Sequence, residues 1–180
     1  MKQIGLAFRI FATDHDDYYP MMLSTNMGGS KEWRNSPDQI FRHFQVLSNE
    51  LSVPRVLLCP SDVKNRQEST NFQMDFESKG NVAISYFIGA DADEVEPSMM
   101  LTGDRHITDG RFGVPTVHSR IVNFGTNHSA AFGAAWSSQF GNKTHGNVAM
   151  GEGRVSQLKS VQLREVLRIS SDLTNQLMIP

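Results

Sequence analysis

From Pro54 to Leu158 the chain shows extended rather than helical periodicity, and this stretch limits the possible folds more than any other feature. Short segments rich in β-branched and aromatic residues follow one another, bounded by Pro, Gly and Asn. Strands are predicted at residues 55–59, 81–89, 98–103, 117–124, 146–150 and 154–158. Consecutive strands without helices between them favour an α+β fold, in which an antiparallel sheet carries its helices on one side.

The last two predicted strands flank the sequence Gly151-Glu152-Gly153. Val148 and Met150 alternate with smaller residues, and an acidic residue followed by Gly is typical of a hairpin turn, because Gly adopts positive φ readily. The nearby histidine, glutamate and glycines could instead belong to a metal or phosphate site. We favour the hairpin.

Helical periodicity marks both ends of the chain and one internal segment. The first predicted helix covers residues 2–13, and no N-cap residue precedes it. A second is predicted at 37–51, with Ser36 as the N-cap, and a third from Val161 with Ser160 as the N-cap. The apolar face of the third helix is predicted to contain Leu163, Val166, Leu167 and Leu173.

The bulk composition is that of an ordinary globular chain. Its 180 residues are predicted to form a single domain over 1–180. A net charge of −2 without a basic stripe argues against a nucleic-acid partner. No apolar run approaches the ~20 residues of a membrane helix. The single cysteine, Cys59, is predicted to be structural.

Two loop segments concentrate carboxylates, which are the ligands that Ca²⁺ prefers. The first segment contains Asp14, Asp16 and Asp17. Neither of the two segments has the pattern of an EF-hand loop. A calcium site is expected in the other segment, residues 89–97; the alternative is that these acids only solvate the loop. The predicted ligands are Asp91, Asp93, Glu94 and Glu96.

Catalytic motifs give little support to an enzyme. The chain has no G-x-S-x-G sequence, P-loop or dinucleotide-binding glycine pattern, and no histidine pair has the spacing of a zinc motif. His43 is predicted to be solvated. One alternative function is a metal-assisted hydrolase using His128, His145 and Glu152, with residues 125–144 as a lid. Another is a carbohydrate- or substrate-binding module whose aromatic residues are Tyr18, Tyr19, Trp33 and Trp136.

Four segments together resemble type IV pilin-like proteins. The first is "KQIGLAFRIFATDHDDYYP", in which a helix leads to an acidic turn and an aromatic-Pro step. The others are "LLCPSD", "NVAISYFIG" and the closing "HGNVAMGEGRV", where Glu152 stands in place of the usual Asp. More narrowly, the chain resembles pseudopilins with a C-terminal His-to-Asp-Gly motif, often described as type II secretion protein G-like.

This resemblance implies a pilin-like fold and a structural role without catalysis. Residues 1–14 would be the C-terminal half of a longer helix, whose missing apolar half anchors the full-length protein in the inner membrane. The domain would lie in the cell envelope, on the periplasmic or extracellular side, and contact other pseudopilin subunits and the secretion apparatus. Exposed residues of the first helix, Lys2, Gln3 and Arg9, are expected to make the assembly contacts.

Overall fold

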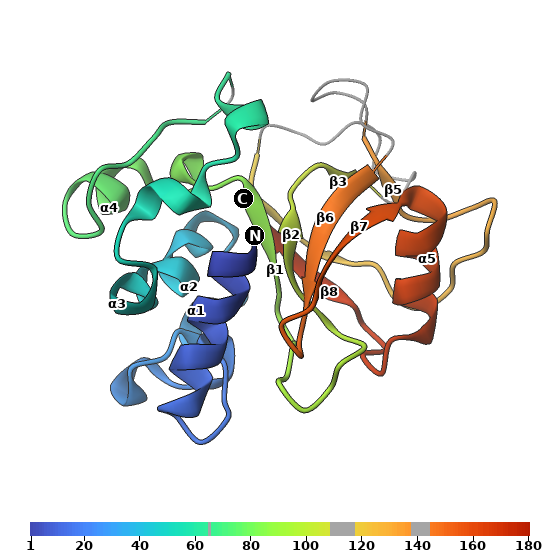
Figure 1. Cartoon of the computed structure of the whole chain (residues 1–180), viewed down its shortest axis with the longest axis horizontal. Helices are drawn as coiled ribbons and strands as arrows, with labels where there is room; N and C mark the ends of the chain where they lie inside the picture. The colour runs from blue at the N-terminus through green and yellow to red at the C-terminus, as the bar shows by residue number, and fades with distance from the viewer. Residues whose placement is uncertain (65, 109–117, 138–144) are drawn as a thin grey trace.

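A six-stranded antiparallel sheet forms the centre of the molecule (Figure 1). The computed structural model describes residues 1–64, 66–108, 118–137 and 145–180. The strand order is β4-β8-β1-β2-β6-β7, and every neighbouring pair is antiparallel. The strands are β1 (Tyr86–Gly89), β2 (Met100–Asp104), β4 (Arg120–Asn123), β6 (His145–Met150), β7 (Val155–Lys159) and β8 (Gln176–Ile179). A separate pair joins β3 (Ile107–Thr108) to β5 (Ala135–Trp136). The α+β class predicted from the sequence is confirmed at this level.

Helices cover both faces of this sheet. Side chains of successive strand residues point to opposite faces, so Tyr86 and Ile88 join one hydrophobic cluster and Phe87 joins the other. The first cluster contains α1 (Lys2–Thr13), and the second contains Leu163 and Leu167 of α5 (Ser160–Ile169). Figure 1 shows the two helices on opposite sides of the sheet. The expectation that all helices lie on one side was therefore wrong.

The first helix has the predicted bounds and packs its apolar stripe on the sheet. Ile4 and Phe8 are fully buried, and the Phe8 ring meets Tyr19 edge-on at 5.7 Å between centroids. At Gly5 the helix faces β6, where an added Cβ would make an ordinary van der Waals contact with the Cβ of Ala149, at 3.6 Å. Leu6 and Ile10 are 59% and 43% exposed, so the opposite face of the helix keeps apolar side chains in solvent.

Short helices fill the space beside α1. They are α2 (Phe41–Gln45), α3 (Ser48–Leu51), α4 (Asp75–Lys79) and the 3₁₀ helices η1 (Pro20–Met22), η2 (Thr25–Met27), η3 (Lys31–Trp33), η4 (Pro37–Gln39), η5 (Pro54–Leu57), η6 (Pro60–Asp62) and η7 (Gly80–Ala83). The helix predicted at 37–51 is thus divided into η4, α2 and α3, and Ser36 makes no side-chain cap hydrogen bond. Its apolar positions were nevertheless predicted correctly, since the residues buried there are Ile40, Phe41, Phe44, Leu47 and Leu51.

Two strand predictions also need correction. Residues 54–57 form η5 instead of a strand, because Pro54 and Pro60 each occupy the first turn of a 3₁₀ helix. Of the strand predicted at 81–89, residues 86–89 form β1, and residues 80–83 form η7. The strands predicted at 98–103 and 117–124 correspond to β2 and β4, although residue 117 lies outside the described ranges.

The C-terminal quarter contains the predicted hairpin. Strands β6 and β7 pair from His145↔Lys159 to Ala149↔Val155, and Gly153 has φ of 87° in the turn. Helix α5 ends at Ile169, so Leu173 lies beyond it and is 79% exposed.

The hydroxyl of Ser160 does not cap α5 as predicted. It accepts a hydrogen bond from the Trp136 backbone N–H at 3.0 Å and so joins α5 to β5. Strand β5 itself falls within the predicted loop 125–144, of which residues 138–144 lie outside the described part of the chain. In the ranges that are described, none of the helices has the length and apolar character needed to cross a bilayer.

Two isoleucines on α1 provide a matched test of this packing. Ile4 is fully buried, so Ile4→Ala should lower the free energy of unfolding by about 2–5 kcal/mol through lost burial and the cavity left behind. Ile10→Ala makes the same chemical change at a 43% exposed site and should cost less than about 1 kcal/mol. Urea unfolding of both variants measures the difference; equal losses would contradict the orientation of α1.

Candidate functional site

The outward face of α1 is the assembly surface that the resemblance predicts. Lys2 and Gln3 are exposed, and Leu6 and Ile10 lie one helical turn apart beside them. Arg9, the third predicted assembly residue, donates to Glu94 at 2.9 Å, with half of its side chain exposed. The face therefore combines two exposed apolar side chains with polar neighbours, one of which is already paired within the chain.

The four predicted calcium ligands have other hydrogen-bond partners. Asp91 pairs with Arg34 and also accepts from Thr174 Oγ1 at 3.1 Å. Asp93 accepts from the backbone N–H of Val95 at 3.0 Å, which closes a local turn. Glu94 pairs with Arg9, and Glu96 accepts from Ser171 Oγ at 2.8 Å.

Each of the four carboxylates is thus held by a different partner, and they do not converge on one point. Over the described ranges, no group of three or more His, Cys, Asp or Glu side chains is placed to hold a metal ion. The segment instead ties α1, η3 and the residues after α5 to the loop that leads into β2. The structure adds no support to a calcium site, which stays a prediction from the sequence.

The residues of the hydrolase alternative do not meet in one site. His145 begins β6 and Glu152 lies in the turn after it, so the strand separates them by roughly 20 Å. Glu152 pairs with Arg154 at 2.8 Å. His128 is held by its own loop, donating from Nε2 to Gly125 O at 3.2 Å and accepting at Nδ1 from Ala134 N at 3.4 Å.

The four aromatic residues of the binding alternative are also divided. Tyr19 and Trp136 are buried, whereas Tyr18 is 49% exposed and Trp33 is partly exposed. Burial raises the pKa of the Tyr19 phenol, which donates to Gly151 O at 2.5 Å and joins the start of η1 to the hairpin. The Arg42 guanidinium lies 5.6 Å from the centre of the Trp33 ring. These four side chains therefore do not form one stacking platform for a sugar.

A buried charged cluster at the junction of helices and sheet was missed at the sequence level. Asp62, in η6, accepts two hydrogen bonds from Arg105 at the end of β2, at 2.7 and 3.0 Å. Both side chains are less than 10% exposed. The two-pronged geometry fits a guanidinium to a carboxylate and satisfies charges that burial would otherwise penalise.

A second arginine extends this cluster to the C-terminal strand. Arg66 Nε lies 3.7 Å from Asp62, and Arg66 donates to the carbonyls of Asn81 and Pro180 at 3.2 and 2.5 Å. Burial, with Arg105 nearby, lowers the pKa of Arg66 to about 10, so it stays charged at neutral pH. One carboxylate thus holds two arginines that connect η6 to β2 and to the residue after β8. The arrangement is a structural clamp, and its only sequence signal was Asp62 within "LLCPSD".

His43 was predicted to be solvated, and this was wrong. It is fully buried, and its Nδ1 lies 2.6 Å from Ser30 Oγ. Burial, reinforced by the nearby Arg34 charge, lowers its pKa to about 3. The error lies in the assignment of the helix face, since His43 is three residues after Ile40 and four before Leu47 and therefore lies beside the apolar stripe at helical spacing.

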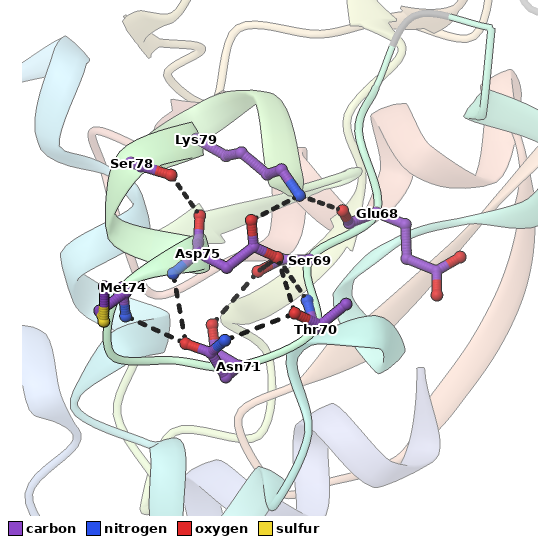
Figure 2. Close-up of polar contacts among 8 residues, drawn as sticks. All are labelled: Glu68, Ser69, Thr70, Asn71, Met74, Asp75, Ser78 and Lys79. Atoms are coloured by element: carbon purple, nitrogen blue, oxygen red, sulfur yellow. Dashed lines mark hydrogen bonds and ion pairs between the residues drawn. The ribbon is translucent and has the colours of Figure 1, made fainter.

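A further polar network fixes the loop before α4 (Figure 2). Asp75 accepts from Thr70 N at 2.7 Å, from the Thr70 and Ser69 hydroxyls, and from Lys79 Nζ at 2.7 Å. The Lys79 ammonium and the Thr70 amide lower the pKa of this carboxyl. Asn71 Oδ1 accepts from the Met74 and Asp75 amides, as a helix cap does. The partners of the Asp75 carboxylate all lie between residues 69 and 79, so this network is also structural.

The buried clamp predicts a large effect from removing its single negative charge. Asp62→Asn keeps the shape of the side chain but leaves Arg105 without its counter-charge, which should cost about 3–5 kcal/mol of unfolding free energy. Glu165→Gln is the control, since it breaks an exposed pair with Arg168 and should cost at most about 1 kcal/mol. Chemical denaturation compares the two; similar losses would show that the clamp adds little stability.

The buried imidazole predicts a pH dependence with a definite sign. The unfolded state takes up a proton at His43 below its ordinary pKa of 6.5, and the folded state does so only near 3. Stability at this residue is therefore complete above pH 6.5 and is lost as the pH falls toward 3. Unfolding free energies at pH 7, 5.5 and 4.5 should fall more steeply for the wild type than for His43→Gln. Parallel profiles would contradict a neutral, buried His43.

Comparisons of the chain with protein-family models, with curated proteins and with solved structures gave no match. The similarity to pilin-like proteins therefore rests on the motifs quoted above. A functional assignment has to be argued from those motifs together with the surfaces and clusters just described.

Proposed function

We propose that this chain is the globular domain of a pilin-like structural subunit, of the pseudopilin type, that acts by assembling with other subunits. The observation that carries the proposal is the pair of exposed apolar residues on α1. A helix that has already packed one face on the sheet still presents Leu6 and Ile10 to solvent, at 59% and 43% exposure. Exposed apolar side chains at helical spacing are what a neighbouring helix would bury.

In this proposal α1 is the part of the domain that contacts neighbouring subunits. Lys2 and Gln3 are exposed on the same helix and would flank the apolar pair, whereas Arg9 is engaged by Glu94. Contacts that repeat head to tail without closing build a filament, and in such contacts the face on α1 meets a different, complementary surface of the next subunit. The full-length subunit would be anchored in the inner membrane, with this domain on the periplasmic or extracellular side, next to other subunits of a secretion or pilus-like apparatus.

A crosslinking experiment in the native host tests this proposal. A photoreactive benzophenone amino acid is introduced at Leu6 in the protein expressed from its own gene, and the cells are irradiated. Adducts with the mass of two or more copies of the chain, or of a copy with another envelope subunit, are expected on immunoblots. The matched control carries the same group at Leu173, an exposed leucine after α5.

The two positions separate specific assembly from random collision. Because Leu6 and Leu173 are both strongly exposed, diffusion-limited contacts should label them to a similar extent. A yield at Leu6 several times that at Leu173 supports an assembly face on α1. Equal yields, or the absence of adducts at Leu6 in cells that contain the protein, would reject the proposal.

A further inference from the structure

A small cavity lies where η6 meets the ends of β1 and β2. Its volume is about 10 Å³, and its lining includes Cys59, Asp62, Ser85, Asp104, Arg105 and His106. Ser85 directly precedes β1, and Arg105 and His106 directly follow β2. The cavity therefore lies beside the Asp62–Arg105 pair, at the junction between the helical region and the sheet.

The hydroxyl of Ser85 identifies this cavity as a polar site. The residue is 2% exposed, and its Oγ has no hydrogen-bond partner among the described residues. Its backbone is fixed on both sides, since its N–H donates to Leu57 O at 2.9 Å and its C=O accepts from Arg105 N at 3.1 Å. The hydroxyl therefore stays in the interior, where a buried polar group without a partner is unfavourable.

Size and charge together indicate the kind of ligand. A volume of about 10 Å³ is close to the minimum for one water molecule and too small for any organic molecule. The two carboxylates that line the cavity, those of Asp62 and Asp104, are matched by Arg105 and by Arg66, which contacts Asp62. Among these four side chains the formal charges sum to zero, so a neutral ligand fits better than an ion.

We propose that this cavity is a binding site for one ordered water molecule that hydrogen-bonds to Ser85 Oγ. The polar groups of η6 and of the end of β2 supply its other partners, in keeping with the two to four bonds that buried waters make. The water thereby bridges the helical region and the sheet beside the Asp62–Arg105 pair. This inference is independent of the assembly role.

Replacing the hydroxyl gives an effect whose sign decides the question. If water bonds to Ser85 Oγ, Ser85→Ala removes a satisfied group, and the melting temperature should fall by roughly 2–4 °C. If the hydroxyl is unsatisfied, the same variant removes an unfavourable group, and the melting temperature should stay constant or rise. A constant or raised melting temperature overturns the proposal.

Oxygen-17 magnetic relaxation dispersion provides the second readout, because it counts internal waters with long residence times. Ser85→Ala should contain one such water fewer than the wild type. Ser69→Ala is the control, since Ser69 is equally buried but donates directly to Asn71 O and Asp75 Oδ2; it should lose stability without losing a water. An unchanged water count in Ser85→Ala overturns the proposal as well.

Discussion

Burial on both sides of the central sheet is the constraint on which the rest of the structure depends. Every residue of β1 and β2 is buried, so neither face of these strands can meet solvent. Two separate clusters must then be covered, one by α1 with the short helices and the other by α5. Helix α1 consequently commits its inner face to the sheet. Any contact of α1 with another molecule must therefore use its outward face, which carries Leu6 and Ile10.

Polar contacts, more than regular helix, organise the half of the chain beside α1. Asn81 alone accepts from Phe41 N and donates to Pro37 O and to Ser119 Oγ, which connects η7, α2 and the approach to β4. Asp62 does the same between η6 and β2 through Arg105. Short helices contribute little stability of their own. Hydrogen bonds of this kind therefore help to fix where each segment lies.

Hydrophobic periodicity within one continuous segment correctly predicted helix α1 and the β6–β7 hairpin. The prolines at 54 and 60 overrode the strand tendency of the residues between them, and tertiary contacts broke the helix predicted at 37–51. Strand β8 was not predicted, because its four residues contain a short continuous apolar run that shows no strand or helix periodicity. Neither Asp62–Arg105 nor Ser30–His43 was foreseen, since both pairs join segments distant in sequence. The exposure of Leu6 and Ile10 was not predicted either.

The position of β8 has a consequence for how the domain acquires its structure. This strand lies between β1 and β4, and in the chain it follows both of them. Until residues 176–179 have been synthesised and have left the ribosome, β1 and β4 each keep an unpaired backbone edge toward the gap between them. The sheet is therefore completed only when β8 becomes available, and a nascent chain stalled before β8 would be open to pairing with other strands.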